Sequence, residues 1–306
     1  MKILLNFNNK INKKNKNKLG GIETVNFNLF NNLKKKFKYI YIKPKKSIKS
    51  YDVIISSNDA KIFNNYKSNK YILWLHNKLQ IEKAIRKRQF FPIISNNIEA
   101  VFVSNYLKNI TSKIYNFKNK TVIPNFLDKQ FENLKISYNR KQIVVWAVSR
   151  DRGLEETINL WIKRFYRKFP KAEFHIFGNI IPEGKKLEKY NIYLHKRVSK
   201  DVLINYYKKS TCSICLGYDE TFCLNAIESM SCGTPVLSFK MTALNDLVIN
   251  NVNGFKVDNF NDLGNRIEKL LIPNKKRLKL IQKTVNFSKK YYFKKIKLKW
   301  IKKISK

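Results

Sequence analysis

The chain has 306 residues, 43% of them hydrophobic, and carries 63 Lys and Arg against 21 Asp and Glu, a formal net charge of +42. This length suits two domains of about 150 residues each, and no apolar run of the sequence approaches the ~18 residues that span a bilayer. The opening residues Met1–Phe7 are too short and too soon polar for a secretory signal, so we expect a cytoplasmic protein. A charge of this size favours polyanionic partners, either nucleic acid or an anionic membrane surface, and does not bear on the fold.

The first half of the chain alternates short apolar runs with amphipathic stretches. Strands are predicted at Ile3–Phe7, Tyr39–Ile42, Val53–Ser56, Tyr71–Leu75, Ala100–Ser104 and Thr121–Pro124, and helices at Ile22–Lys35, Leu79–Phe90 and Asn105–Tyr115. Strands that alternate with helices predict a parallel, doubly wound sheet. No complete G-x-G-x-x-G follows the first strand, so dinucleotide binding is not supported.

Two places in this half are candidates for ligand binding. A Lys- and Asn-rich loop after the first strand leads to Gly20-Gly21, and paired glycines at a helix start let backbone N–H groups approach a ligand closely. Glycine pairs are also common in plain turns. His76 follows the strand Tyr71–Leu75, at the carboxyl edge where open α/β sheets bind ligands. The alternative for His76 is a histidine that only caps the strand.

The second half repeats the α/β pattern after a polar stretch at 131–142, which we interpret as a linker. Strands are predicted at Ile143–Val148, Glu173–Phe177, Ile192–Leu194, Ser213–Leu216, Val236–Phe239 and Phe255–Val257, and helices at Glu155–Arg167 and Lys200–Lys208. The chain therefore predicts an α/β protein with two Rossmann-like doubly wound parallel-sheet domains, at 1–130 and 143–288.

A basic helix is predicted at 289–306. Its apolar residues at helical spacing are Phe293, Ile296, Trp300 and Ile304. This pattern is typical either of binding to a membrane surface or of packing back on the first domain. Both alternatives stay open at this point.

The most informative stretch of the sequence holds two glutamates, Glu220 and Glu228, in the string E-T-F-C-x4-E-x4-G-T-P-V. A helix is predicted to start near Phe222 or Cys223 and to stop at Gly233, because glycine takes the left-handed conformation and the following Pro forbids continuation. A helix N-terminus presents unpaired N–H groups and suits a phosphate. Ionised carboxylates accept hydrogen bonds from sugar hydroxyls. The plain alternative is an ordinary strand–helix–strand unit with surface glutamates.

This string resembles the Glu-x7-Glu signature of the retaining glycosyltransferases of family four, which have the GT-B architecture. The resemblance implies that the two domains face each other across a cleft and that the second domain holds a nucleotide-sugar donor. The implied donor-binding residues are Gly20, Gly21, Arg152, Glu220, Thr221, Phe222, Cys223, Leu224 and Glu228. Glu220 would hold sugar hydroxyls and Glu228 the ribose. His76 and Glu220 are the implied catalytic residues, with His76 contacting the sugar or the acceptor.

The chain departs from the family pattern in two places. Phe126 stands where the family's Val-Ile-Pro-Asn-Gly segment ends in glycine, so a ligand contact from that turn is in doubt. Arg152 fits the basic residue that neutralises the donor's phosphates, since its guanidinium can hold phosphate oxygens bidentately. A second arginine of the family is replaced only loosely by Arg150. The plain alternative for Arg152 is an exposed residue near a helix start.

The expected function is transfer of a sugar from a nucleotide diphosphate sugar to a glycan or lipid-linked acceptor, with retention, in cell-surface polysaccharide or lipopolysaccharide-type biosynthesis. No Asp-x-Asp is present, and we expect no cofactor and no essential metal beyond the nucleotide-sugar co-substrate. Cys212 and Cys215 lack a second pair at zinc spacing and are interpreted as buried thiols.

The expected partners are the donor, the acceptor and an anionic surface at the inner face of the membrane, with no specific nucleic acid. One alternative, motivated by the charge, is a basic nucleic-acid-binding protein, although the sequence contains no known binding module. The other is a catalytically silent GT-B scaffold that acts as a partner subunit.

Overall fold

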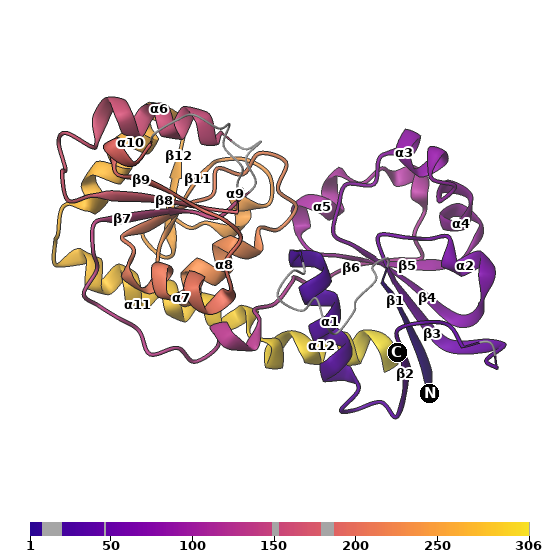
Figure 1. Cartoon of the computed structure of the whole chain (residues 1–306). Helices are drawn as coiled ribbons and strands as arrows, with labels where there is room; N and C mark the ends of the chain where they lie inside the picture. The colour runs from indigo at the N-terminus through magenta and orange to yellow at the C-terminus, as the bar shows by residue number, and fades with distance from the viewer. Residues whose placement is uncertain (8–19, 46, 149–152, 179–186, 306) are drawn as a thin grey trace. The chain divides into compact units, whose positions relative to one another are not determined.

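The computed structural model describes residues 1–7, 20–45, 47–148, 153–178 and 187–305 (Figure 1). The chain divides into two compact units, which are described separately below. Unit 1 comprises Met1–Asp128 and Phe293–Lys306, and unit 2 comprises Lys129–Tyr292. Each unit contains one six-stranded sheet in which all strand pairs are parallel. The predicted α/β class with two doubly wound parallel sheets is confirmed.

Sheet A, in unit 1, has the strand order β2-β1-β3-β4-β5-β6. Its strands are β1 (Lys2–Phe7), β2 (Tyr39–Tyr41), β3 (Ser50–Ser57), β4 (Lys67–Leu75), β5 (Ile98–Phe102) and β6 (Asn119–Val122). The central strands are continuous apolar runs because helices cover both faces of the sheet. In this order the direction of winding reverses between β1 and β3, and ligands bind outside the carboxyl ends of strands at such a switch point.

The helices of unit 1 are shorter than predicted in two places. They are α1 (Gly21–Leu33), α2 (Ile62–Asn65), α3 (Ile81–Arg86), α4 (Phe90–Ser95), α5 (Asn105–Ile110) and α12 (Phe293–Ser305), with a 3-10 turn η2 (Lys113–Tyr115). The single helix predicted at 79–90 is wrong, because Arg88 takes a left-handed φ of 54° and separates α3 from α4. The helix predicted at 105–115 ends early, since the Ser112 hydroxyl accepts from the Ile114 N–H and starts the 3-10 turn.

Helix α12 packs its apolar side on sheet A. Trp300 is fully buried, and its ring lies 4.7 Å from that of Trp74 in β4. Ile296 and Ile304, on the same side of the helix, are 2% exposed. The apolar side that the sequence offered to a membrane is therefore already covered within unit 1.

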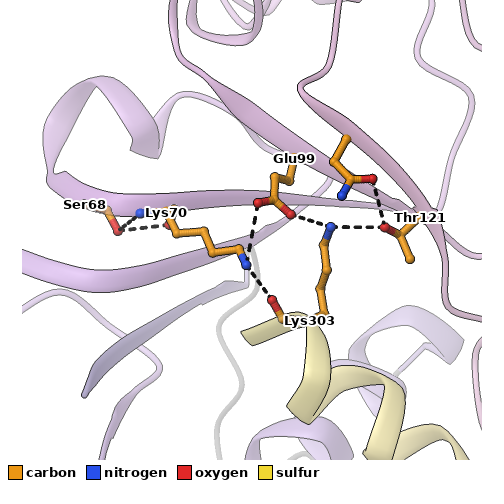
Figure 2. A network of polar contacts seen from close by, with 6 residues as sticks. Ser68, Lys70, Glu99, Thr121 and Lys303 are labelled. Atoms are coloured by element: carbon orange, nitrogen blue, oxygen red, sulfur yellow. Dashed lines mark hydrogen bonds and ion pairs between the residues drawn. The ribbon is translucent and has the colours of Figure 1, made fainter. Parts of the chain in front are cut away.

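A network of charges fixes the end of α12 to the same face of the sheet (Figure 2). The Lys303 ammonium pairs with the Glu99 carboxylate in β5 and donates to the Thr121 hydroxyl in β6 at 3.1 Å. Lys70 in β4 pairs with the other oxygen of Glu99 at 3.6 Å and donates to the backbone carbonyl of Lys303 at 2.7 Å. Glu99 is thus held between two cations, which offsets the cost of its partial burial.

The opposite face of sheet A is covered by α2, α4 and η2. Because successive strand residues point to opposite faces, Tyr71 and Phe102 point away from α12. The Tyr71 ring packs on Phe63 of α2 at 5.1 Å. A chain of ring contacts from Phe102 runs through Phe117 and Tyr115 to α4. Sheet A is therefore doubly wound, with α12 on one face and the α4 region on the other.

Sheet B, in unit 2, has the strand order β12-β11-β10-β7-β8-β9. Its strands are β7 (Ile143–Trp146), β8 (Glu173–Phe177), β9 (Ile192–His195), β10 (Cys212–Ile214), β11 (Val236–Phe239) and β12 (Gly254–Val257). This is the order of a dinucleotide-binding Rossmann sheet, and its switch point lies between β7 and β10. A ligand site is therefore expected outside the carboxyl ends of β7 and β10.

Helices lie on both sides of sheet B, with α6 and α10 on one side and α7, α8 and α11 on the other (Figure 1). They are α6 (Leu154–Arg164), α7 (Lys200–Lys209), α8 (Leu224–Ser231), α9 (Leu244–Leu247), α10 (Phe260–Leu271) and α11 (Lys276–Ser288), with 3-10 turns at Lys129–Phe131, Glu188–Tyr190 and Lys289–Tyr291. Among the described residues, no helix combines the length and the apolar content that crossing a bilayer requires.

The stretch 131–142, expected as a linker, contributes a buried arginine to unit 2. Arg140 donates to the carbonyl of Tyr207 at the end of α7 (2.8 Å) and to the carbonyl of Cys232 after α8 (2.9 Å). Its pKa is lowered to about 10 by burial, so it stays protonated and holds both helix ends together. All four cysteines are free and buried, as predicted for Cys212 and Cys215.

Candidate functional site at the carboxyl edge of sheet B

Two loops meet outside the carboxyl ends of β7 and β10. Gly153, at the end of the β7 loop, has a left-handed φ of 86°. A Cβ on Gly153 would lie 2.8 Å from Cδ1 of Leu216 and 3.1 Å from the ring of Tyr218, both in the loop after β10. Only glycine allows this backbone conformation together with so close an approach. The side-chain amide of Asn225 also donates to the carbonyl of Ala147, which ties the first turn of α8 to the end of β7.

The loops at this edge concentrate unusual backbone conformations. Gly217 has φ 101°, and the non-glycine residues Asp219, Cys223 and Thr242 have φ values of 54°, 68° and 52°. The Thr242 hydroxyl donates to the Gly217 carbonyl at 2.7 Å and so supports the turn. Left-handed non-glycine residues cost about 1–3 kcal/mol each and cluster at ligand sites. The backbone itself thus marks this edge as a candidate site.

Helix α8 begins at Leu224, directly after the left-handed Cys223, close to the start predicted from the sequence. It ends at Ser231, and Gly233 follows with φ 79°. An added Cβ on Gly233 would lie 2.6 Å from the guanidinium of Arg140 and 2.8 Å from Ile281. Gly233 therefore serves both the helix stop and the packing of α8. The other end of α8, its start, is held at the switch point by the contact of Asn225 with Ala147.

Glu228 lies on the second turn of α8 and is 5% exposed. Its carboxylate accepts a hydrogen bond from the ammonium of Lys200, the first residue of α7, at 2.5 Å. The ammonium also lies 5.1 Å from the centre of the Phe131 ring. A carboxylate is costly to bury without a cation or several hydrogen-bond donors, and Lys200 supplies the cation.

Sequence reasoning missed Lys200. It precedes Glu228 by 28 positions, and no spacing rule connects the start of one helix with the interior of the next. The only signal in the sequence is the N-cap Ser199, whose hydroxyl accepts from the Val202 N–H and fixes the start of α7.

The other predicted donor residues of the Glu220–Glu228 segment lie on the loop into α8 and at its first residue. The backbone of Glu220 is fixed by its N–H, which donates to Gly217 at 3.1 Å, and by its carbonyl, which accepts from Ala243 at 3.3 Å. Phe222 is 6% exposed and packs edge-on against the ring of Tyr291. Thr221, Cys223 and Leu224 continue the same segment. Arg152 lies outside the described residues, and only its neighbour Gly153 is placed.

The predicted residues of unit 1 lie at the carboxyl edge of sheet A. Gly20 and Gly21 form the start of α1, and the Gly20 carbonyl accepts from the N–H of Thr24 at 3.0 Å. The side-chain amide of Asn26 in α1 donates to the Ser57 hydroxyl at the end of β3 at 3.0 Å. The start of α1 is therefore tied to the end of a central strand. The Lys- and Asn-rich loop before it lies outside the described residues.

His76 follows β4 at the same edge of sheet A and is 2% exposed. Its ring lies 4.3 Å from that of Trp74, and its backbone N–H donates to the side-chain carbonyl of Asn58 at 2.8 Å. Burial lowers the pKa of His76 to about 3, so the imidazole is neutral at physiological pH. A neutral imidazole can donate one hydrogen bond and accept another, but it cannot serve as a cation.

The other two histidines form a separate pair on β8 and β9. Nδ1 of His175 lies 2.8 Å from Nε2 of His195, and Nε2 of His175 lies 2.9 Å from the carboxylate of Glu173. Burial lowers the pKa of both imidazoles. Neither strand end borders the switch point between β7 and β10.

Comparison with known proteins gives matches in sequence and in structure. A curated relative, an uncharacterized glycosyltransferase of Methanocaldococcus jannaschii, is 28% identical over 250 residues, which are 76% of this chain and 68% of the relative. HepE of Anabaena in complex with UDP superposes with a TM-score of 0.72 and 15% identity over the whole of both chains. S. aureus TarM, in a complex that includes UDP, gives a TM-score of 0.65 and 17% identity over 83% of this chain.

The chain spans 55% of the length of TarM, about half of that protein. At these identities the two solved structures show the fold alone, and they confirm the predicted GT-B class. The family model described as glycosyl transferases group 1 matches residues 127–287, which is more than half of this chain and contains Glu220 and Glu228. The chain therefore belongs to the glycosyl transferases group 1 family.

Proposed function

We propose that this protein transfers a sugar from a nucleoside diphosphate sugar to a hydroxyl group of a glycan or lipid-linked acceptor. One observation carries the proposal. The Glu220–Glu228 segment lies at the switch point of sheet B, where parallel sheets bind ligands. Family membership supports sugar transfer, and the complexes of HepE and TarM with UDP support a nucleotide-sugar donor.

The donor roles follow from the chemistry of each group. Glu228 would accept hydrogen bonds from the ribose hydroxyls, and Lys200 would hold its carboxylate in position. Glu220 would accept from hydroxyls of the sugar. The N–H groups at the start of α8, from Phe222 to Leu224, would face the diphosphate together with Arg152.

In the proposed reaction the acceptor oxygen forms a bond to the anomeric carbon of the sugar. The bond from that carbon to the diphosphate oxygen breaks, and its electron pair leaves with the nucleoside diphosphate. The acceptor proton passes to the departing phosphate oxygen. Negative charge thus grows on the diphosphate, and the fixed N–H groups of α8 and Arg152 stabilise it there. We propose retention of configuration on the basis of the Glu-x7-Glu motif.

The carboxyl edge of sheet A is proposed to bind the acceptor. His76 is a neutral hydrogen-bonding group there. The backbone N–H groups of Gly20 and Gly21, at the start of α1, stay proposed for the donor, as the family resemblance implies. A lipid-linked or cell-surface polysaccharide acceptor fits the net charge of +42, which favours anionic surfaces.

Calorimetric titration with UDP-, GDP- and ADP-sugars, with UDP-sugars first, tests the donor assignment. We expect one nucleotide class to bind, and Glu228→Gln and Arg152→Gln each to abolish measurable binding. Glu156→Gln, an exposed acidic position in α6, is the matched control and should bind as the wild type does. If nucleotide release from an accepted donor persists at the wild-type rate in both site variants, the assignment is wrong.

A further inference from the structure

Helices α3 and α4 present large apolar side chains to solvent. Ile85 is 53% exposed, Phe91 69% and Ile94 44%, all within fifteen residues of one helical hairpin. Single exposed apolar side chains are common in folded proteins, but a group of them on one surface marks an interaction site. We call the hairpin with these three side chains the α3–α4 surface.

Ring contacts tie helix α4 to the neighbouring turn η2. The ring of Phe90 in α4 lies 5.8 Å from that of Phe91 and 5.9 Å from that of Tyr115 in η2. Next to Tyr115, Ile114 is 53% exposed, and Ile110 at the end of α5 is 43% exposed. Exposed apolar side chains are therefore present on α5 and η2 as well as on α3 and α4.

The same surface is strongly basic. Lys83, Arg86, Lys87 and Arg88 are all exposed, and the hairpin carries one acidic residue, Glu82. Lys and Arg side chains can lay their apolar stems along a hydrophobic surface while the charges reach polar headgroups. Apolar side chains surrounded by cations are typical of segments that lie in the interface of an anionic bilayer.

The location of the α3–α4 surface sets it apart from α12. The contacts of Phe102 and Tyr115 place α4 on the face of sheet A opposite to α12. Helix α3 begins at Ile81, shortly after β4 ends at Leu75, so the hairpin borders the carboxyl edge of the sheet. This is the edge that carries His76.

We propose that the α3–α4 surface docks the protein on an anionic membrane surface, with Phe91, Ile85 and Ile94 at the level of the acyl chains. The proposal rests on the proposed function only in that docking would bring a lipid-linked acceptor to the edge at His76. A second copy of the chain is disfavoured as occupant, because a two-fold contact would set the same four cations against one another. Nucleic acid is disfavoured because Ile85 and Ile94 offer no ring for stacking.

Co-sedimentation with vesicles of phosphatidylglycerol and phosphatidylcholine in equal amounts, at physiological ionic strength, tests the proposal. We expect the wild type to bind, and a Phe91→Ser/Ile94→Ser variant to bind roughly tenfold or more weakly. Leu298→Ser is the matched apolar control, because Leu298 is 67% exposed on α12 and lies outside the proposed surface. It should bind as the wild type does.

The contribution of charge is tested by a second pair of variants. Arg86→Gln/Arg88→Gln should weaken binding by roughly fivefold for each charge removed. Lys299→Gln/Lys302→Gln is the matched control. These lysines line a cavity of about 450 Å³ beside α12. The control removes the same charge from the other face of unit 1 and should change binding little. Equal losses in both pairs would show that the net charge alone drives binding and would overturn the proposal.

Two further outcomes separate this proposal from the proposed function. Binding of the nucleotide-sugar donor without vesicles should be the same in Phe91→Ser/Ile94→Ser as in the wild type. A wild type that binds donor but no vesicles would overturn the docking proposal and leave the proposed function standing. A dimeric wild type that becomes monomeric in Phe91→Ser/Ile94→Ser, with vesicle binding unchanged, would assign the surface to self-association instead.

Discussion

The carboxyl edges of sheets A and B are shaped by different means, although both sheets are parallel and six-stranded. At the edge of sheet B the shape comes from the backbone, with left-handed residues such as Gly153, Asp219 and Cys223. At the edge of sheet A the left-handed residue Asn58 (φ 55°) is joined by side-chain contacts, such as the amide of Asn26 on the hydroxyl of Ser57. Backbone geometry imposes glycines and fixed spacings that a sequence pattern records, whereas side-chain networks can be built in many ways.

The part of the chain that the family model matches differs between the two units in the same way. The model covers 127–287, which is nearly all of unit 2 and almost none of unit 1. We infer that unit 2 performs what the family has in common and that unit 1 holds what is particular to this chain. The acceptor chemistry is therefore to be sought in unit 1.

The largest effect is expected from Gly254→Ala, which tests how far unit 2 depends on close backbone approaches. An added Cβ would overlap the backbone carbonyl of Val236 in the neighbouring strand β11. We expect a loss of about 3 kcal/mol or more in the free energy of unfolding. Hydrogen–deuterium exchange should show the loss of protection in unit 2, with unit 1 still protected.

Gly178→Ala is the matched control. Gly178 has a φ of 73°, but apart from its chain neighbours no heavy atom of the described residues lies within 4 Å of its added Cβ. The loss in the free energy of unfolding for Gly178→Ala should come from the left-handed backbone alone and be about 1–2 kcal/mol. Similar losses in the two variants would show that conformation, and not close packing, sets the demand for glycine in unit 2.

The next effect is expected from Lys200→Met, which leaves the carboxylate of Glu228 buried without its cation. Breaking a buried ion pair costs about 3–5 kcal/mol, and we expect about 2 kcal/mol because Lys200 is itself 32% exposed. Urea unfolding measures the loss, and calorimetry should show weaker donor binding. Lys200→Arg should restore most of both, while Lys209→Met at the other end of α7 should change neither. If Lys200→Met is as stable as the wild type, the ion pair between Lys200 and Glu228 does not stabilise the site.

His76 should make unit 1 sensitive to acid. In the unfolded chain it binds a proton near its ordinary pKa of about 6.5, whereas in the folded chain it does so only near pH 3. The unfolded state therefore binds more protons between these values, and stability falls as the pH falls through this window. At pH 5 the loss is about 2 kcal/mol. Denaturant unfolding from pH 7.5 to 5 should show a shallower decline for His76→Gln than for the wild type, and parallel declines would contradict the buried neutral imidazole.

The smallest effect is expected at the end of α12. Lys303→Met removes one of the two cations that hold Glu99 in Figure 2 and should lower the free energy of unfolding by about 1–2 kcal/mol. Lys302→Met, at the neighbouring exposed position, should change it by less than about 0.5 kcal/mol. Thermal unfolding of the two variants compares them directly. If both melt at the wild-type temperature, the network of Figure 2 adds no stability.

Much of the fold could be predicted from the sequence because strands of parallel sheets are buried on both faces and so form apolar runs. The run Val236–Phe239 was placed correctly for this reason. The helix predicted at 79–90 failed because periodicity does not reveal the break at Arg88, where the backbone takes a left-handed φ of 54°. Helices α10 and α11 were not predicted, although Asn259, whose side chain accepts from the Asp262 N–H, is an N-cap signal for the start of α10.

The candidate site was predictable where it depends on spacing along one segment. Glu220 and Glu228 were found because one turn and one helix hold them. Lys200 was not found, because its contact with Glu228 depends on how α7 packs against α8, which spacing does not record. The exposure of Phe91 could not be predicted either, since a buried and an exposed aromatic residue in a short helix look the same in a sequence.

The position of α12 has a consequence for the order in which the chain folds. The strands of sheet A are synthesised first, but the helix that covers Trp74 follows only after the whole of unit 2. At roughly 5–20 residues per second, the ribosome needs on the order of ten seconds to make that intervening segment. Unit 2 is one continuous stretch and can complete its fold in that time. We therefore expect a chain truncated after Tyr292 and released from the ribosome to carry a finished second unit beside a first unit whose Trp74 is still open to chaperones.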